Sequence, residues 1–228
     1  MQMIFQDPYT SLNPRMTVTQ IIADPLVVNR AYSGKRDLES KVLQLMEAVG
    51  LDERYKDVYP HEMDGGRRQR VGVARALALE PEFIVCDEPV SALDVSVQAQ
   101  ILNLLMDLQE ERGLTYVFIS HDLSVVKHIS DEIAVMYLGQ CVERAPTQEL
   151  FQNPYHPYTK ALLASIPLPS LRPEDKLRKP IQGEISSAIE PQKGCRFAPR
   201  CSRATSHCLG QEIPILQKKN HLVMCLHV

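Results

Sequence analysis

Apolar residues recur at helical spacing in three stretches of the chain. Leu38–Val49 places them three and four residues apart, as one face of a helix requires, and Gly50 follows where the helix would end. Val97–Leu108 and Leu123–Ile129 repeat this spacing, and the first of the two stops before Gly113. We therefore expect a helix over each of the three stretches.

Three shorter runs are apolar at nearly every position, which is typical of strands buried on both faces. They are Phe83–Cys86, Thr115–Ile119 and Ile133–Tyr137. Strands that alternate with helices favour right-handed crossovers and a parallel sheet covered on both faces. The pattern thus predicts an α/β fold with a mainly parallel sheet, with its chemistry at the carboxyl ends of the strands.

Composition and charge narrow the class of protein. The 228 residues are 44% apolar and carry a formal net charge of −3. This composition excludes a disordered or collagen-like chain, and the charge gives no reason to expect a nucleic-acid partner. We expect no membrane-spanning helix, because no stretch approaches about 18 uninterrupted apolar residues. Met1–Gln6 lacks the basic and apolar regions of a signal peptide.

The two parts of the chain differ in charge and in residue types. Residues 1–144 carry 14 basic and 22 acidic side chains, whereas residues 145–228 carry 11 and 6. The second part also holds 10 of the 16 prolines and four of the six cysteines. We therefore predict a boundary near residue 145, between a regularly patterned domain and a basic, Cys-rich extension.

Two of the apolar runs end at ionisable side chains. Phe83–Cys86 leads into Asp87 and Glu88, and Thr115–Ile119 is soon followed by His121. An apolar strand that ends in two carboxylates is what a Walker B motif needs. Asp87 would hold Mg²⁺ through water, and Glu88 would act as a general base on the water that attacks a γ-phosphate. For this pattern alone, the alternative is a strand end capped by solvated acids.

Motifs on either side of this strand extend the pattern. Upstream lies His61–Val71 (HEMDGGRRQRV), whose Gly-Gly pair opens a helical pattern and leaves backbone N–H groups to face an anion. Downstream lies Ser91–Asp94 (SALD), before the strand that leads to His121. In order, spacing and element type, the series resembles the nucleotide-binding subunit of ABC transporters. By that resemblance Gln6 belongs to the Q-loop, Met63–Arg67 is the signature motif, SALD is the D-loop and His121 is the H-loop switch.

Several segments are closer still to one branch of this family. Gln6–Arg15 (QDPYTSLNPR), Cys86–Asp94 (CDEPVSALD), Met136–Gly139 (MYLG) and His156–Leu162 (HPYTKAL) look like the ATPase subunits of dipeptide and oligopeptide importers, the F-type subunit in particular. The similarity covers essentially the whole chain, including its cysteine-rich tail.

The resemblance implies an architecture and a set of partners. Residues 1–144 would form an incomplete P-loop NTPase (ABC ATPase) domain with a helical subdomain at about 16–80, and residues 145–228 a peptide-importer extension. ATP and Mg²⁺ would be bound. The partners would be a related, non-identical ATPase subunit, two membrane permease subunits and, indirectly, a peptide-binding protein, all at the cytoplasmic face of the cell membrane.

The resemblance also implies roles for single residues. His121 would contact the γ-phosphate and hold the attacking water, and Gln6 would sense nucleotide and couple it to the membrane subunit. Gly65 and Gly66 would present backbone donors to the ATP held by the opposite subunit, and Asp94 would lie at the dimer seam.

One departure from the family pattern concerns the phosphate loop. The motif G-x-x-x-x-G-K-[ST] wraps phosphates with its glycines and lysine, and the chain has no match to it. The only Gly-Lys pair, Gly34-Lys35, is followed by Arg36. Because Walker A precedes the Q-loop in the family, we expect an N-terminally truncated chain of marginal stability. A truncated gene, a mis-assigned start and a domain fragment are the alternatives.

The second departure lies in the signature motif. Asp64 and Arg67 stand where the family has serine and glutamine. A serine hydroxyl can donate to a phosphate, whereas an ionised carboxylate about 4 Å away repels it by about 4 kcal/mol at an effective dielectric of 20. Arg67 would offset part of this. We expect the motif to complete the partner's ATP site poorly.

Four cysteines in the extension offer a separate chemistry. They are Cys195, Cys201, Cys208 and Cys225, separated by five, six and 16 residues. Disulfides are disfavoured in a cytosolic chain, and these gaps are wider than those of usual zinc sites. Four thiolates also suit a [4Fe–4S] cluster, and the tail resembles the importer extension in which such clusters are found. Four free thiols are the remaining alternative. The other two, Cys86 and Cys141, are predicted to be small apolar core residues.

Three classes of function stay open. The first is the energy-coupling ATPase subunit of a peptide importer. The second is a soluble ABC ATPase of chromosome maintenance or DNA repair, but the roughly 58 residues from Gln6 to Asp64 cannot hold the long heptad insertion that such a protein needs. The third is a non-catalytic remnant that binds at most a metal cluster or a partner.

Overall fold

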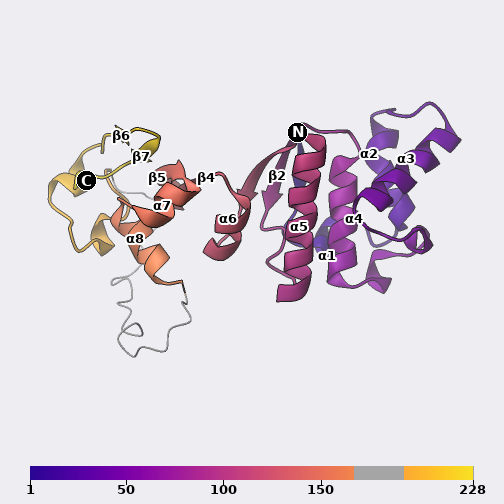
Figure 1. The fold of residues 1–228 in the computed structure, drawn as a ribbon, viewed down its shortest axis with the longest axis horizontal. Coiled ribbons are helices and arrows are strands. Elements are labelled where there is room, and N and C mark those ends of the chain that lie inside the picture. The colour runs from indigo at the N-terminus through magenta and orange to yellow at the C-terminus, as the bar shows by residue number, and fades with distance from the viewer. Residues whose placement is uncertain (167–192, 228) are drawn as a thin grey trace. The chain divides into compact units, whose positions relative to one another are not determined.

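The computed structural model describes residues 1–166 and 193–227. Two units, Met1–His121 and Asp122–Val228, make up the chain, and each has a β-sheet of its own, as Figure 1 shows. Within the described ranges, no helix is long and apolar enough to cross a membrane. Residues 167–192 of the predicted C-terminal extension lie outside the described residues.

The sheet of the first unit is parallel. β1 (Gln2–Ile4), β2 (Phe83–Asp87) and β3 (Thr115–Ile119) pair in this order, with β2 in the centre. The two strands predicted here, and their parallel pairing, are confirmed. Strand β1 was not predicted, because three residues are too few to show a period. Since the strands run the same way, their carboxyl ends lie along one edge.

Helices fill the rest of the first unit. They are α1 (Pro8–Ser11), α2 (Val18–Val28), α3 (Lys35–Ala48), α4 (Gly65–Leu77) and α5 (Val95–Arg112), with 3₁₀ turns at Glu53–Tyr55 and Pro60–Glu62. Two of the predicted helices, α3 and α5, are confirmed. Each is followed by a glycine with positive φ, Gly50 and Gly113, both at +64°. This left-handed backbone is cheapest for glycine, so these residues end the helices.

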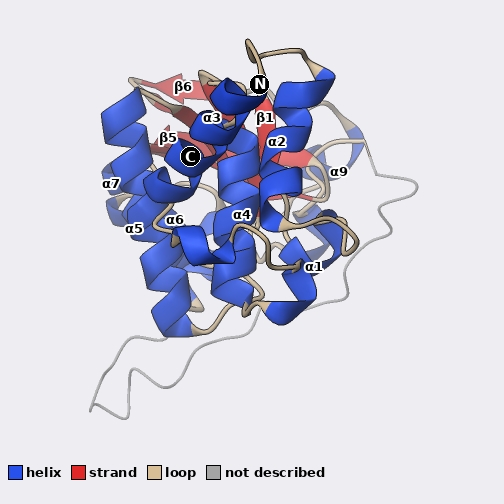
Figure 2. Cartoon of the chain, turned by 90° about the vertical axis from the view of Figure 1, so that its right-hand side faces the viewer, coloured by secondary structure: helices blue, strands red, loops and turns tan. Residues whose placement is uncertain are grey.

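Helix α4 lies in the core of the first unit and packs against β1, α2 and α5 (Figures 1 and 2). Its Val71, Val73 and Ala74 are fully buried, and so are Ile84 and Cys86 on one face of β2. Burial raises the pKa of the Cys86 thiol to about 12, as expected for a cysteine used as an apolar side chain. The opposite face of the sheet is more exposed, since alternate residues of β3 there are solvent-accessible.

The second unit has an antiparallel sheet, with the strands in the order β4-β5-β7-β6. Its elements are α6 (Leu123–Ile129), β4 (Glu132–Tyr137), β5 (Gln140–Pro146), α7 (Thr147–Gln152), α8 (Pro157–Ala164), a 3₁₀ turn at Ala198–Arg200, α9 (His207–Gly210), β6 (Leu216–Lys218) and β7 (His221–Val223). The predicted helix α6 is confirmed at its expected residues.

The prediction that Ile133–Tyr137 would join the parallel sheet is wrong. This strand, β4, pairs antiparallel with β5 through a two-residue turn. The turn residues Leu138 and Gly139 both have positive φ, +47° and +77°, as the favoured hairpin turns require. Leucine is a rare residue at such a position, so the usual sequence signal of a hairpin was weak.

The division into units falls earlier than the change in composition. The predicted boundary near residue 145 lies within β5, because the β4–β5 hairpin belongs to the second unit. Residues 16–80, predicted to form a helical subdomain, hold α2, α3 and α4 and contain no strand. The domain limits of 1–144 and 145–228 stay a prediction.

The cysteine-rich segment packs onto the β4–β5 hairpin. One buried cluster joins hairpin residues such as Tyr137 and Val142 to Phe197 and Met224 from the end of the chain. The rings of Tyr137, Tyr158 and Phe197 lie 4.7 to 5.3 Å apart, a spacing that favours aromatic contact. The tail therefore shares a core with the hairpin.

Candidate functional site

Three polar side chains meet at the carboxyl edge of the parallel sheet. Gln6 follows β1, Glu88 follows β2 and His121 follows β3. Gln6 Nε2 donates to Glu88 Oε2 at 2.8 Å, and His121 Nδ1 lies 3.0 Å from Glu88 Oε1. The strand order thus brings together three residues that are far apart in the sequence, as the strand-end argument predicted for Glu88 and His121.

The backbone around Glu88 is constrained. Its φ is +43°, in the left-handed region that a non-glycine residue seldom adopts. Glu88 N donates to Ile119 O at 3.0 Å, which ties the turn after β2 to the end of β3, and the Ser91 hydroxyl donates to Glu88 O at 3.1 Å. Backbone strain of this kind clusters at functional sites, and here it turns the carboxylate toward Gln6 and His121.

The electrostatics of the cluster favour an ionised Glu88. The hydrogen bond from His121 holds the pKa of the Glu88 carboxyl below its ordinary value. The side chain of His121 is 73% exposed and that of Glu88 only 23%. An ionised carboxylate only accepts hydrogen bonds, so His121 Nδ1 carries the shared proton. Asp87 is the last residue of β2, paired in register with Ile119 and partly exposed beside this cluster.

The signature segment begins α4 with an acidic cap. Asp64 is the N-cap, and its Oδ1 accepts from Arg67 N at 2.8 Å. The guanidinium of Arg67 donates to the other carboxylate oxygen at 2.5 Å and lies over the ring of Tyr55. Asp64 therefore already has both carboxylate oxygens paired with Arg67, at the helix end where a phosphate would need donors.

The two glycines of the signature segment have neighbours of their own. A Cβ on Gly66 would lie 2.6 Å from Val97 Cγ1, and one on Gly65 would lie 3.1 Å from Leu93 Cδ2. Asp94 is the N-cap of α5, and its carboxylate accepts from Val97 N at 3.0 Å. The beginnings of α4 and α5 are thus side by side, and Gly66 is required for their close packing.

Two arginines of α4 connect the signature helix to the segment around Gln6, and sequence analysis did not single them out. Arg75 donates to Ser11 O at 2.7 Å and lies over the ring of Phe5. Arg68 donates to Pro60 O at 2.7 Å and lies over the ring of Tyr9. An arginine on a helix is an unremarkable surface residue in sequence, so only the structure shows these links.

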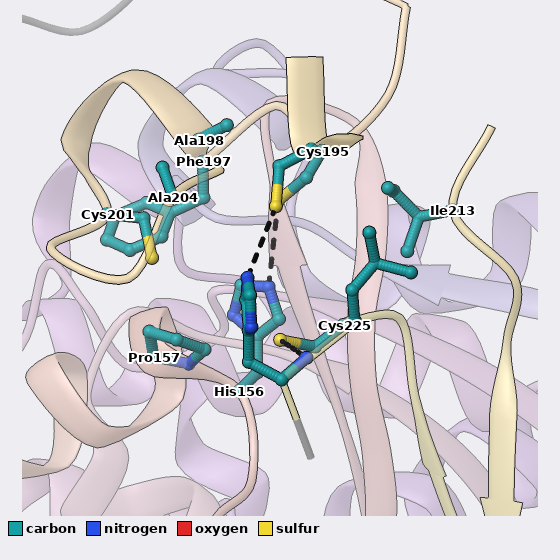
Figure 3. A pocket seen from close by; sticks show the side chains of 12 residues that line it. His156, Pro157, Cys195, Phe197, Ala198, Cys201, Ala204, Ile213 and Cys225 are labelled. Carbon is teal, nitrogen blue, oxygen red and sulfur yellow. Dashed lines mark hydrogen bonds between the residues drawn. The ribbon is translucent and has the colours of Figure 1, made fainter. Parts of the chain in front are cut away.

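A second site lies in the second unit. All four tail cysteines line one small cavity of about 20 Å³, room for about one water molecule. Figure 3 shows the sulfur atoms of Cys195, Cys201 and Cys225 around the ring of His156. Within the described residues, all six cysteines are free, and no three His, Cys, Asp or Glu side chains stand close enough to hold a single metal ion.

Two histidines at the cavity were missed by sequence analysis. His156 Nε2 lies 3.9 Å from Cys195 Sγ, and His227 Nε2 lies 3.6 Å from Cys208 Sγ. Burial lowers the pKa of His156 to about 4, so its ring is neutral at pH 7. His156 belonged to the quoted HPYTKAL segment, and His227 follows Cys225 by two residues; this closeness to Cys225 was the signal available for it.

A buried carboxylate, that of Glu143, binds the backbone next to the cavity. Glu143 Oε1 accepts from Tyr155 N at 2.6 Å and lies 2.7 Å from His221 Nε2, and Oε2 accepts from His156 N at 3.0 Å. The side chains of Glu143 and His221 are 0% and 3% exposed. This network ties β5 and β7 to the start of α8. Cys141, two residues earlier, is exposed, so its prediction as a core residue is wrong. A register shift between Val135 and Met136 breaks the alternation of β5, so Cys141 pairs with the exposed Met136.

Two family models match the chain. The model described as "ABC transporter" matches residues 1–91, and "Oligopeptide/dipeptide transporter, C-terminal region" matches residues 142–208. The first match contains Gln6, the signature segment and Glu88. The second contains Glu143, His156 and three of the four tail cysteines.

Curated relatives match over the whole chain. The dipeptide transport ATP-binding protein DppF of Haemophilus influenzae is 53% identical over 230 residues, covering 100% of this chain and 69% of the relative. DppF of Escherichia coli is 50% identical, covering 100% and 67%. The oligopeptide transport ATP-binding protein OppF of Salmonella typhimurium is 52% identical, covering 100% and 68%. The chain spans about two thirds of the length of these relatives.

Solved structures share the fold. The ATP-binding cassette MJ0796, as a dimer in a post-hydrolysis state bound to ADP and Pi, matches with a TM-score of 0.57 and 30% identity, over 64% of this chain and 62% of that one. CbiO1 from Clostridium perfringens, part of the ABC transporter complex cbiONQ, matches with a TM-score of 0.60 and 28% identity, over 67% and 59%.

Proposed function

This chain belongs to the family of dipeptide and oligopeptide transport ATP-binding proteins, and from that premise we propose that it is the ATP-hydrolysing subunit that energises peptide import across a cell membrane. Family membership rests on identities of 50–53% over the whole chain. By family, the chain is an ABC-type ATPase subunit. We assign the choice between dipeptides and oligopeptides to the peptide-binding protein and the membrane subunits.

The observation that carries the proposal is the meeting of Gln6, Glu88 and His121 at one edge of the sheet. Gln6 and His121 both donate hydrogen bonds to the Glu88 carboxylate, so Glu88 stays ionised and can accept a proton. We assign Glu88 the role of general base on the water that attacks the γ-phosphate. His121 positions that water, and Gln6 transmits the state of the site to the membrane subunit. Asp87 would hold Mg²⁺, and the bound ion would supply positive charge to the phosphates.

The signature and D-loop residues are assigned to the seam with a second ATPase subunit. Gly65 and Gly66 present backbone N–H groups at the start of α4, and Asp94 caps the neighbouring helix. Asp64 and Arg67 replace the serine and glutamine expected there, and they form an ion pair with each other. A carboxylate therefore stands where a hydrogen-bond donor to the phosphate is expected. We propose that this face completes the partner's ATP site weakly, so that the two sites of the dimer are unequal.

The phosphate contacts of a Walker A loop are not available from these 228 residues, since no G-x-x-x-x-G-K-[ST] occurs in them. A second candidate function, that of a non-catalytic remnant, is favoured by the signature motif, where Asp64 and Arg67 form an ion pair with each other. The two candidates differ in a measurable way. A remnant hydrolyses no ATP whatever segment precedes it, whereas a catalytic segment regains ATP hydrolysis when a phosphate loop is supplied.

The cysteine cavity is proposed as an iron–sulfur site. Four thiols line one cavity, which fits the donor set of a [4Fe–4S] cluster. The cavity holds about one water, so the four thiols would move outward around a cluster. Cys195, Cys201, Cys208 and Cys225 would be its ligands, and the cluster would supply one-electron chemistry or a structural cross-link.

The partners follow from the same proposal. They are a related ATPase subunit in a heterodimer, two membrane permease subunits and, indirectly, a peptide-binding protein. The chain would act as a peripheral subunit at the cytoplasmic face of the membrane.

The test joins the chain to a phosphate loop. The N-terminal segment of a curated relative, up to its Q-loop, is fused in front of Gln6, and the fusion is assembled with the permeases and the second ATPase in proteoliposomes. We expect ATP binding by the fusion and ATP-dependent peptide uptake by the complex. A fusion that binds ATP but supports neither hydrolysis nor uptake would establish the remnant instead.

A further inference from the structure

Arg75 of the signature helix α4 holds residues 5–11, which contain Gln6 and which we call the Gln6 segment. Its Nη1 donates to Ser11 O at 2.7 Å, and its guanidinium lies 5.7 Å from the centre of the Phe5 ring. Ser11 is the last residue of α1, and the last carbonyls of a helix find no partner within it, so Arg75 supplies one. One side chain thus contacts both ends of the Gln6 segment.

Arg68 adds a third contact from the same face of α4. It precedes Arg75 by seven residues, which is about two turns of the helix. Its guanidinium lies 4.9 Å from the centre of the Tyr9 ring, and its Nε donates to Pro60 O at 2.7 Å. Helix α1 also packs on α4. The backbone on both sides of Gln6 is therefore attached to α4, whereas the Gln6 side chain reaches the edge of the sheet.

The link through Arg75 is charged and partly shielded from water. Arg75 is half-buried, and this burial lowers the pKa of its guanidinium, while Asp24 on α2 acts in the opposite direction. An arginine nevertheless stays protonated in proteins. A hydrogen bond from a charged donor is roughly twice as strong as a neutral one, and low exposure strengthens it further. We therefore expect the Gln6 segment and α4 to stay together when either of them moves.

We propose that Arg75 and Arg68 are positioning residues that make the Gln6 segment and α4 move as one body. This inference rests on the proposed function, which assigns Gln6 to the membrane subunit and the start of α4 to the ATP of the partner subunit. A shift of the Gln6 segment by the membrane subunit then moves the N–H groups of Gly65 and Gly66 relative to that ATP. The two arginines are the contacts through which this coupling passes.

Arg70 provides a matched control on the same helix. Its Nη1 donates to Val49 O at 2.5 Å, so Arg70 also binds a backbone carbonyl at the end of a helix. That helix is α3, which lies outside the Gln6 segment. Arg70→Met therefore removes a charge and a hydrogen bond from α4 while it leaves the contacts of Arg75 in place.

The first measurement tests the link in the full chain. Nitrogen-15 NMR relaxation gives the order parameters of the backbone amides of residues 9–11. We expect about 0.85 in the wild type, typical of a rigid backbone, and less than about 0.6 in Arg75→Met. Arg75→Lys keeps a charged donor and should restore most of the order, and Arg70→Met should leave these residues unchanged. Equal order parameters in Arg75→Met and the wild type would overturn the link, whatever the site does.

The second measurement tests the coupling. Arg75→Met is introduced into the fusion that carries a phosphate loop, the complex is assembled in proteoliposomes, and ATP hydrolysis and peptide uptake are measured together. We expect the number of peptides taken up per ATP hydrolysed to fall about tenfold, within the range typical of coupling between two sites. The KM for ATP should change little, because the contacts of Arg75 are with the Gln6 segment. Arg70→Met should keep the ratio of the parent fusion.

The outcomes separate this inference from the proposed function. An unchanged ratio of uptake to hydrolysis in Arg75→Met would overturn the coupling role and leave the proposed function standing. A parent complex that hydrolyses no ATP would overturn the proposed function and, with it, the coupling role.

Discussion

The edge of the parallel sheet and the cysteine cavity hold their reactive groups in opposite ways. At the edge, Gln6, Glu88 and His121 come from three turns, and the histidine is mostly exposed. In the cavity, His156 and Glu143 are buried and bonded to backbone N–H groups. At the edge, side chains are hydrogen-bonded to one another, whereas at the cavity the side chains of Glu143 and His156 are hydrogen-bonded to the main chain.

The difference determines which of the two regions can rearrange its hydrogen bonds. Side chains that are held by hydrogen bonds to other side chains can change partners when a nucleotide and a second subunit arrive. Buried groups with main-chain partners cannot move without breaking several hydrogen bonds, each of which is costly to leave unmade. The edge therefore suits a catalytic switch, and the hydrogen-bond network of Glu143 and His156 suits a rigid support beside the cavity. The predictions below test this contrast.

The largest expected effect is on the stability of the cavity. Glu143→Ala removes a buried carboxylate that binds two backbone N–H groups and His221. Breaking such a buried pair from one side should lower the free energy of unfolding by about 3–5 kcal/mol. Urea denaturation followed by far-UV circular dichroism measures it. The matched control is Glu132→Ala, whose exposed ion pair with Arg144 should be worth less than about 1 kcal/mol. Equal losses in the two variants would contradict the contrast.

The next effect concerns the packing of α4 on α5. Gly66→Ala places a Cβ 2.6 Å from Val97 Cγ1, and this overpacking should destabilise the first unit by about 1–3 kcal/mol. Gly72→Ala, in the same helix, meets nothing within 4 Å and should stabilise it by about 0.5–1 kcal/mol. Denaturation curves of the two variants should shift in opposite directions. A neutral Gly66→Ala would show that the position is not fixed by packing.

A smaller effect is expected at the signature motif. Asp64→Ser removes the carboxylate that, on our proposal, faces the partner's phosphate. It should raise ATP turnover of the assembled pair about tenfold, or about 1.4 kcal/mol in barrier. Asp52→Ser makes the same change at another exposed N-cap that is paired with an arginine, and it should leave turnover unchanged. If ATP turnover of Asp64→Ser did not rise, the proposal that Asp64 makes the two ATP sites of the dimer unequal would be wrong.

The smallest effect is a change in one pKa. Because the hydrogen bond from His121 lowers the pKa of Glu88, His121→Ala should return it toward about 4.3, the ordinary value for glutamate. With a depressed folded pKa, the bond stabilises the fold above about pH 4.3, and this contribution is lost as the pH falls through the folded value. Carbon-13 NMR of the Glu88 carboxyl measures the shift, with His128→Ala as the control. An unchanged Glu88 titration in His121→Ala would exclude the bond in solution.

Sequence periodicity predicted β2, β3, α3 and α5 of the first unit but missed β1 and α2. The apolar runs at β2 and β3 ended at Glu88 and His121, and parallel pairing made those ends neighbours. The same pattern failed at β4, because its apolar run looks like that of a buried parallel strand although alternate residues are exposed. Only the turn at Leu138 and Gly139, with positive φ at both residues, distinguishes the two kinds of strand, and leucine is not a residue that predicts such a turn.

The cavity could be predicted only in part. Spacing identified the four cysteines as a set, and the structure brings them to one cavity. Their two histidine neighbours and Glu143 could not be found in this way, since their roles depend on contacts across 13 to 78 positions of sequence. Burial of a carboxylate is a tertiary property, and no local pattern marks it.

ATP hydrolysis at the sheet edge is the central claim, and a pair of glutamate variants tests it most directly. Glu88 and Glu82 lie at opposite ends of the same strand, and Glu82 is exposed. In the fusion that carries a phosphate loop, assembled with its partners, Glu88→Gln should lower ATP turnover by about 10²–10⁴-fold, because the general base is lost while ATP still binds. Glu82→Gln should leave turnover unchanged. Equal turnover in Glu88→Gln and the parent would contradict the account.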